Sequence, residues 1–330
     1  MKNRSIAMGV LDMTTYIDVR AFAVAAILAT TTACQTPSGG AALTLGNEYA
    51  KQGLLREAID QYRKSLAIDP TNAAANRNLG IMLVKTGDYH NSIKVLEIAA
   101  EKIPADFDTN FYLGEACRAE GRYGDGIYRY QQALRARSND PRALKALAWS
   151  FYKIRYYSEA LTNSQRLLAA DSKDTQASVI AARILIKLRR FDEALNTIHS
   201  AIKNSDKESM PFLKSVEGDI LFETGNTAKA SEAYGAALRD APLTASALYG
   251  MGRITSQKGL KDKATGFLER AIRVRPEMAE AHFLLGEVLE SSDVAQSKKH
   301  FEIFAKLAAT DPDLLTQLEQ TRKKLDTARN

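Results

Sequence analysis

Small and large apolar positions recur along the chain with a period of 34 residues. A glycine or alanine returns within an apolar stretch at intervals of 34 residues, with a single interval of 36. Glycine costs about 1 kcal/mol relative to alanine inside a helix, so its regular return indicates that another element approaches closely there. The recurring positions are Gly46, Gly80, Gly114, Ala148, Ala182, Gly218, Gly252 and Gly286.

Each recurring small residue has apolar neighbours at helical spacing. In the first period, Leu45 precedes Gly46 and Tyr49 follows it by three residues. A second small residue, Ala58, comes twelve residues after Gly46, and the bulky Tyr62 follows four residues later. The pattern predicts two amphipathic helices in each period, with the bulky residue of the second filling the space beside the small residue of the first.

Turn residues separate the predicted helices. Gly53 and Gly87 lie between the two helices of their periods, where glycine accepts the left-handed conformation that ends a helix. Pro70 and Pro104 follow the second helices. A helix–turn–helix unit of this length is similar to the tetratricopeptide repeat, and the stretch "LGNEYAKQGLLREAIDQYRKSLAIDP" resembles the motif of that family in most of its slots.

The resemblance covers residues 42–308 as eight repeats and implies an all-α fold, a right-handed superhelical solenoid. Residues 309–330 are expected to form a C-terminal capping helix that covers the last repeat. Asp311 can cap this helix, with Pro312 at its first position. The apolar face expected on it consists of Leu314, Leu315, Leu318 and Leu325.

The N-terminal segment has the pattern of a secretory signal. Basic residues precede the apolar run 21–32, whose twelve residues would rise only about 18 Å as a helix, too short for a hydrocarbon core of roughly 30 Å. The following "TTAC" resembles a bacterial lipobox, which implies cleavage before Cys34 and acylation of its thiol. We therefore expect a signal peptide over 1–33 and a lipidated Cys34 with a flexible tether over 34–41.

This resemblance implies a localisation in the bacterial cell envelope, as an outer-membrane lipoprotein that faces the periplasm and is held in the membrane by acyl chains on Cys34. Gln35 favours the outer over the inner membrane by the usual enteric sorting rule. The alternatives are the inner membrane, or a cytoplasmic protein with a frayed N-terminus and a buried Cys34.

Composition and motifs argue against catalysis. Hydrophobic residues make up 45% and charged residues 25% of the chain, and the net charge is +6 without a long Lys/Arg block, so we expect no nucleic-acid partner. The two cysteines form no CxxC pair, and no zinc-protease, phosphate-loop or hydrolase motif is present. The "GMG" at 250–252 lies inside a predicted helix, and Cys117 fills a core slot. We expect no enzyme activity, cofactor or metal.

The family resemblance implies that the first helix of each repeat lines a concave binding face. At the slots that bind ligands in the family, this chain is basic and aromatic in its first two-thirds and acidic later. Trp149, the only tryptophan, looks like an anchor for a peptide, the alternative being that it packs between repeats. The candidate partner-binding residues are Arg118, Arg142, Lys145, Trp149, Tyr152, Lys153, Arg183 and Lys187, and the late acidic slots include Asp219, Glu223, Glu287 and Glu290.

These features together predict a non-enzymatic, membrane-anchored scaffold that binds a protein segment in its groove. Lipidated arrays of this kind resemble the Tad/Flp pilus-assembly lipoproteins and the pilotins of outer-membrane secretins, which implies a secretin or pilus component as partner. The alternative is a general envelope co-chaperone, or an adaptor for peptidoglycan or quality-control enzymes. A third hypothesis, a cytoplasmic adaptor or regulatory enzyme subunit, requires that the leader is not a signal.

Overall fold

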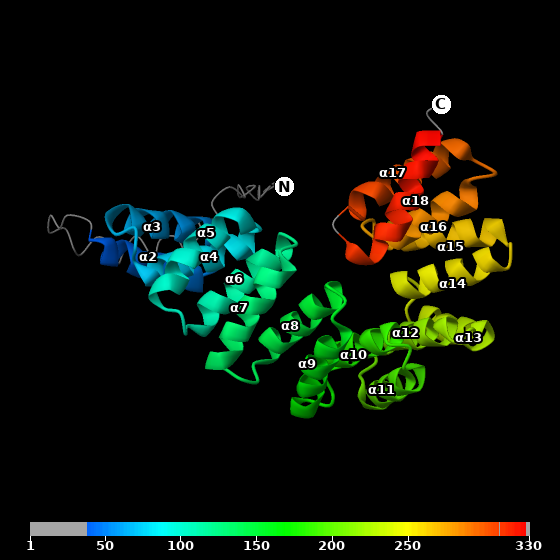
Figure 1. Cartoon of the computed structure of the whole chain (residues 1–330), viewed down its shortest axis with the longest axis horizontal. Coiled ribbons are helices and arrows are strands. Elements are labelled where there is room, and N and C mark those ends of the chain that lie inside the picture. Colours follow the sequence, from blue (N-terminus) through cyan, green and yellow to red (C-terminus); the bar gives the residue numbers. More distant parts are fainter. Residues whose placement is uncertain (1–37, 310, 328–330) are drawn as a thin grey trace, which may run out of the picture.

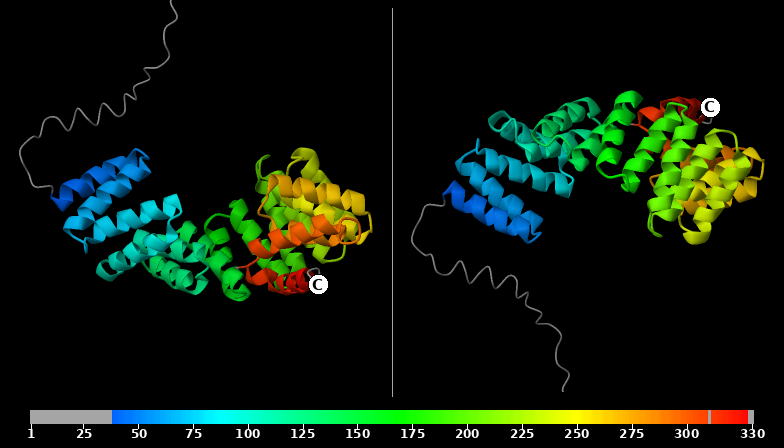
Figure 2. Two further views of the ribbon diagram at one scale, coloured as in Figure 1. Left: turned by 90° about the horizontal axis from the view of Figure 1, so that it is seen from above. Right: turned by 90° about the horizontal axis from the view of Figure 1, so that it is seen from below.

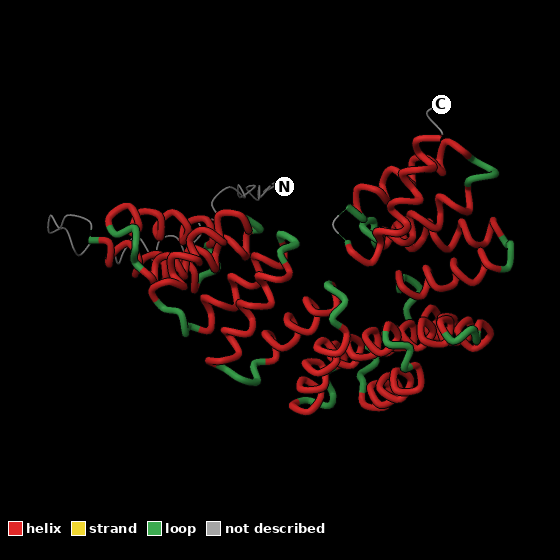
Figure 3. The backbone as a smooth tube through the Cα atoms, viewed as in Figure 1, coloured by secondary structure: helices red, strands yellow, loops and turns green. Residues whose placement is uncertain are grey.

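The computed structural model describes residues 38–309 and 311–327, which form α-helices and one 3-10 turn joined by short loops (Figure 3). The all-α fold is thereby confirmed. The helices are α2 (Gly39–Lys51), α3 (Leu55–Ile68), α4 (Ala73–Thr86), α5 (Tyr89–Lys102), α6 (Phe107–Ala119), α7 (Tyr123–Ala136), α8 (Pro141–Lys153), α9 (Tyr157–Ala170), α10 (Thr175–Lys187), α11 (Phe191–Asn204), α12 (Met210–Glu223), α13 (Thr227–Asp240), α14 (Ala245–Gln257), α15 (Lys261–Val274), α16 (Ala279–Leu289), α17 (Val294–Leu307), η1 (Pro312–Leu314) and α18 (Leu315–Thr327).

Helices α2 to α17 pair into eight consecutive hairpins that stack into a curved solenoid (Figure 1). Each even-numbered helix also contacts the next even-numbered helix, which places the first helices of the hairpins along the inner side of the curve. The curve brings the segment before α18 back to the end of α8, where Asp311 forms an ion pair with Lys153 (Figure 2). The inner face is therefore concave and is lined by the first helix of each unit.

Wherever the recurring small residue is a glycine, it lies against a bulky residue of the second helix, fifteen or sixteen positions later. A methyl group on Gly80 would lie 2.6 Å from Leu96 Cδ2, and one on Gly114 would lie 2.7 Å from Tyr130 Cε1. Both distances are far below the normal carbon–carbon contact of about 3.5–4.0 Å. The close approach predicted from the glycine spacing is therefore present.

The "GMG" sequence at 250–252 has a packing role. Gly252 faces Leu268 of α15, as the repeat pattern requires. Gly250 faces the ring of Tyr234 from α13, and a methyl group on it would lie 2.5 Å from both Tyr234 Cε1 and Cε2. Both glycines lie inside α14, which confirms the helical location predicted for this sequence.

The turns between paired helices use the left-handed conformation expected of glycine. Gly53, Gly87, Gly121, Gly225 and Gly259 all have φ between +70° and +82°. The turns after α8 and α10 differ, because an arginine takes the position that glycine has elsewhere. These residues, Arg155 and Arg189, have φ of 65° and 57°, which is strained for a residue with a side chain.

The two ends of the described chain differ in part from the sequence-based boundaries. Helix α2 begins at Gly39, capped by the Ser38 side chain, so residues 39–41 are helical and do not belong to a flexible tether. Cys34 and the expected signal peptide over 1–33 lie outside the described residues. None of the described helices is long and apolar enough to cross a membrane.

At the C-terminus, the expected helix is preceded by the 3-10 turn η1, in which Asp311 accepts a hydrogen bond from the Asp313 backbone N–H. Leu314 and Leu318 are buried against Phe304 of α17, as expected. Leu315 is 49% exposed, so its expected place on the apolar face was wrong. Successive residues of a helix point in different directions, and here the buried one of the two neighbours is Leu314.

Candidate functional site

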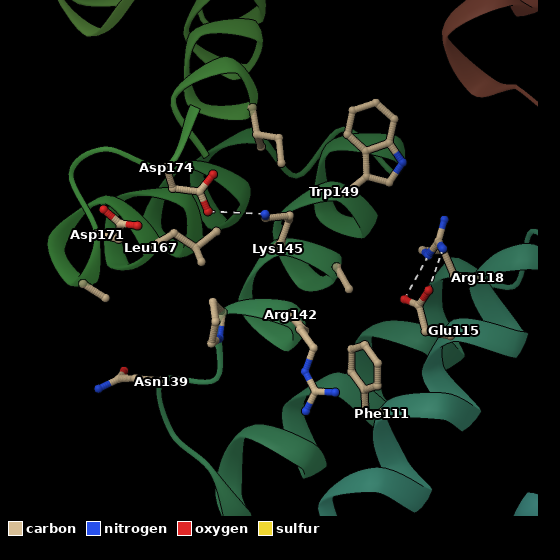
Figure 4. A pocket seen from close by; sticks show the side chains of 14 residues that line it. Phe111, Glu115, Arg118, Asn139, Arg142, Lys145, Trp149, Leu167, Asp171 and Asp174 are labelled. Atoms are coloured by element: carbon tan, nitrogen blue, oxygen red, sulfur yellow. Dashed lines mark hydrogen bonds and ion pairs between the residues drawn. The ribbon is translucent and has the colours of Figure 1, made fainter. Parts of the chain in front are cut away.

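A cavity of about 690 Å³ lies on the concave side between α6, α8 and α10 (Figure 4). Phe111, Glu115 and Arg118 of α6 form one wall, and the Asp171 to Asp174 turn forms the opposite wall. Helix α8 forms the floor between them. Four of the eight predicted partner-binding residues line this cavity: Arg118, Arg142, Lys145 and Trp149.

Helix α8 positions three of these four side chains. Asp140 caps the helix by accepting hydrogen bonds from the Arg142 and Ala143 backbone N–H groups, and Pro141 stands in the first turn. Arg142, Lys145 and Trp149 then follow at spacings of three and four residues, which places them on one face of the helix. The opposite face carries Leu144 and Leu147, which are buried in the core.

The cations of the cavity are all paired with carboxylates. Arg118 binds Glu115 at 2.8 Å, Arg142 binds Asp140 at 3.2 Å, and Lys145 lies 3.3 Å from Asp174. The expectation of a basic groove was therefore wrong at this point, because each predicted cation has an acidic neighbour. Two of the acidic partners, Asp140 and Asp174, are helix caps. The third, Glu115, directly follows the recurring Gly114, which is a ligand slot of the family, so the sequence alone could have identified it.

Glu115 joins two of the groups around the cavity. It accepts hydrogen bonds from Arg118 and from the buried Tyr130 hydroxyl, the latter at 2.5 Å. Burial opposes the charge of Arg118, but the hydrogen bond to Glu115 prevails and raises its pKa. Arg118 is therefore a fixed cation whose direction is set by Glu115.

Aromatic rings supply the apolar surface of the cavity. The Arg142 guanidinium lies over Phe107 and Phe111, with its Cζ 5.2 and 5.1 Å from the two ring centroids. The Trp149 ring stacks on Tyr152, with centroids 5.3 Å apart and planes 17° from parallel. Trp149 is half-buried, so its stack holds it in place while part of the ring stays open to the groove.

The other four predicted residues lie outside this cavity, toward the C-terminal ends of α8 and α10. Tyr152 is buried under Trp149, and burial raises its pKa above the usual range. Arg183 is half-buried on α10, and its charge acts on Tyr152. Lys153 and Lys187 face the segment that precedes α18, rather than the cavity.

The late acidic slots are partly neutralised as well. Lys324 of α18 lies 2.8 Å from Glu290 and 4.0 Å from Glu287. Arg253 pairs with Glu223 at 2.7 Å. The acidic end of the groove is therefore covered in part by the C-terminal helix, a contact that repeat slots alone do not predict.

Chemistry for catalysis or metal binding is sparse. Among residues 38–309 and 311–327, no three His, Cys, Asp or Glu side chains gather as metal ligands would. The thiol of Cys117 is buried, and burial raises its pKa to about 11, which suits packing rather than nucleophilic attack.

The one cluster of histidines has a structural role. His282 Nε2 lies 3.0 Å from the Pro276 carbonyl oxygen, and its Nδ1 lies 2.9 Å from His300 Nδ1. Asn76 and Asn110 hold the same position in the second and third units and donate to the Pro70 and Pro104 carbonyl oxygens. His282 thus replaces an asparagine that ties the start of a hairpin to the preceding turn.

Comparison with known families agrees with the repeat pattern. Models described as TPR repeat, tetratricopeptide repeat and tetratricopeptide repeat-like domain match residues 46–87, 79–141 and 147–252. The chain is a tetratricopeptide repeat protein. Hairpins of this family serve as a scaffold for protein–protein interaction.

Solved structures show the same fold. A tetratricopeptide repeat protein from Parabacteroides merdae matches with a TM-score of 0.66 and 16% identity, over 77% of this repeat protein and 100% of that chain. Yeast Tom70 matches with a TM-score of 0.63 and 17% identity, over 91% of this chain and 66% of that one. PilF of Pseudomonas aeruginosa matches with a TM-score of 0.50 and 16% identity, over 63% and 94%. No curated protein matches in sequence.

Proposed function

We propose that this repeat protein is a non-enzymatic adaptor that binds an extended protein segment in the cavity between α6, α8 and α10. The observation that carries the proposal is the half-buried ring of Trp149 in the cavity lining, which stacks on Tyr152. A rigid aromatic ring in a concave site is the kind of residue that dominates binding energy at protein interfaces.

The ion pairs around the Trp149 ring suit the polar main-chain groups of a bound segment. Lys145 bridges Asp174 and the Gln176 side chain, and Arg118 is held by Glu115. Paired charges of this kind present fixed donors and acceptors without the desolvation cost of a single unpaired charge. The cavity therefore fits a segment with one apolar or aromatic side chain for Trp149 and with main-chain groups for the rim.

We further propose that acyl chains on Cys34 anchor the adaptor to the outer membrane, where it acts in the assembly of a pilus or secretion apparatus. The support is the lipobox-like "TTAC" after a signal-like apolar run, together with the repeat array. Confinement to a membrane raises the effective concentration of a captured partner near its assembly site. Labelling with a palmitate analogue tests the anchor, because Cys34→Ser must abolish the label.

Capture from detergent-solubilised native membranes tests the groove. The bait is the full chain, and the test variant is W149A/R142Q, which removes the ring and the guanidinium over Phe111. The matched control is Y128A/R129Q on α7, which also removes one aromatic ring and one guanidinium, from an exposed tyrosine and a half-buried arginine that lie 5.3 Å apart outside the cavity. Circular dichroism and urea unfolding establish that both variants are folded.

We expect a secretin or pilus component to bind the wild type and the α7 control but not W149A/R142Q. Proteins that bind all three baits equally would show that the cavity is not the binding site. Capture of only proteases or cell-wall enzymes, again lost with W149A/R142Q, would keep the groove but replace the assembly role with that of an envelope adaptor.

A further inference from the structure

The segment before α18 lies against the ends of two helices from the middle of the array. Asp311 Oδ2 is 2.6 Å from Nζ of Lys153, although 158 residues separate them in sequence. Asp313 lies 3.8 Å from Arg155 and 3.9 Å from Lys187. Residues 311–313, here called the acidic segment, thus meet a cationic site made of Lys153, Arg155 and Lys187.

The contact is more enclosed than an ordinary surface ion pair. The side chains of Lys153 and Asp313 are only 15% and 16% exposed. Tyr152 and Tyr157 lie next to it, and after burial the charge of Asp313 contributes most to raising the pKa of both phenols. Arg155 and Lys187 are more open, with 54% and 40% of their side chains exposed, so the short pair between Lys153 and Asp311 is the one that salt screens least.

The positive charge of the cationic site comes from its side chains alone, because the helix ends beside them carry the opposite charge. Lys153 and Lys187 are the last residues of α8 and α10, and the C-terminal end of a helix carries a partial negative charge that repels carboxylates. Arg155 adds a cation at a turn where five other units have glycine, and it adopts the strained φ of 65° to do so. Strain that is retained at such a position points to a role beyond folding.

The cationic site continues directly into the candidate groove. Lys153 Nζ lies 5.5 Å from the centre of the Trp149 ring, so it borders the groove on one side and the acidic segment on the other. A partner that reaches along α8 past Trp149 would meet the acidic segment next.

We propose that the cationic site binds an acidic partner segment with two carboxylates separated by one intervening residue, and that the protein's own acidic segment occupies this site until a partner displaces it. The proposal rests on the proposed function, because the site continues the Trp149 groove. Asp311 and Asp313 show the ligand chemistry directly: each carboxylate is held by its own cations, with one residue between them.

Displacement of the acidic segment must open the array, because this segment cannot detach from the last hairpin as a free loop. Leu314 and Leu318 anchor the chain next to the acidic segment on Phe304 of the last hairpin, and Ala308 is buried on its other side. The acidic segment therefore moves together with the C-terminal hairpins. Release of the ion pairs lets these hairpins move away from α8, a hinge-like change that couples partner binding to the curvature of the solenoid.

Peptide binding tests the proposal without knowledge of the natural partner. The probe is a fluorescein-labelled peptide that copies residues 307–318, compared with the same peptide carrying asparagine in place of both aspartates. The test variant of the full chain is D311N/D313N, in which asparagine still caps η1. The matched control, E302Q/E319Q, removes the same charge from exposed positions of α17 and α18.

We expect D311N/D313N to bind the acidic peptide about 10-fold more tightly than the wild type, if the site is open in about a tenth of wild-type molecules. The asparagine peptide should not show this gain, and adding K153Q/K187Q should abolish it. Small-angle scattering should show a more open particle for D311N/D313N than for E302Q/E319Q.

Equal peptide binding by D311N/D313N and the wild type would overturn the proposal, as would an equal gain in E302Q/E319Q, which would reveal a mere effect of net charge. An unchanged scattering profile would refute the opening of the array. The readout is a defined peptide, so a failed capture through Trp149 would leave this result standing, and a failed peptide experiment would leave the capture result standing.

Discussion

Replacing Gly250 by alanine should destabilise the sixth and seventh repeats strongly, although alanine is the better helix former. Gly250 lies in α14, where its Cα faces the ring of Tyr234 from the preceding hairpin. A methyl group there would lie 2.5 Å from two ring carbons. The Tyr234 side chain is fully buried, so the ring has no solvent to move into.

The ring is also fixed from its other sides. Gly218 of α12 faces it, and a methyl group at that position would lie 2.5 Å from Tyr234 Cε1. The Tyr234 hydroxyl donates a hydrogen bond of 2.7 Å to Asp219, and a ring displaced by the new methyl group would lose it. Overpacking costs about 1–3 kcal/mol and a buried hydrogen-bonding group left unpaired about 1–3 kcal/mol, against a gain of about 1 kcal/mol in helix propensity. The expected net loss is about 1–5 kcal/mol.

Gly266 of α15 provides the control, because it is exposed and a methyl group there would have no atom within 4 Å. Gly266→Ala should therefore raise the stability by about 1 kcal/mol.

Urea unfolding followed by circular dichroism measures both variants, and hydrogen exchange locates the loss, since repeat arrays need not unfold in one step. In G250A the Tyr234→Leu change should reduce the cost, because the second and seventh repeats have leucine at this slot. A G250A chain as stable as G266A would refute the packing argument.

Two further predictions concern protonation and turn geometry. Burial lowers the pKa of His282 and His300, so the unfolded chain takes up protons at a higher pH than the folded chain does. Stability should therefore fall as the pH drops below about 6.5, by about 1.4 kcal/mol per pH unit for each imidazole that stays neutral in the folded chain. His282→Asn can keep the hydrogen bond to the Pro276 carbonyl oxygen. In this variant the urea midpoint should change less between about pH 7.5 and 5.5, roughly the titration range of histidine. An unchanged pH dependence of the midpoint would exclude the histidine pair as its cause. Arg189→Gly should stabilise and Gly225→Ala destabilise by about 1–2 kcal/mol, since both positions have positive φ; equal urea midpoints in the two variants would exclude backbone strain as the cause.

The sequence predicts the hairpins because each hairpin is stabilised by local contacts. Gly80 and Leu96 are only sixteen residues apart, and their contact can be inferred from spacing alone. The ligand slots of the family place Trp149 and Lys145 on the concave face, and both residues line the cavity there. These slots failed to predict the charge of the cavity, since Asp174 and Asp140 lie in caps and turns, outside the helical slots from which the charge was counted.

The contact between Asp311 and Lys153 shows why the remainder could not be predicted. In a solenoid, each repeat contacts only its neighbours, so a pattern of repeats carries information about adjacent units and none about units that the curvature brings together. Small rotations between successive hairpins add up over four repeats before α18 reaches α8, and no single residue determines their sum. Yet both sides of this contact depart from the repeat: Arg155 stands where glycine is usual, and Asp311 and Asp313 lie beyond the last hairpin. Departures from a repeat pattern are thus the positions at which contacts between distant repeats should be sought.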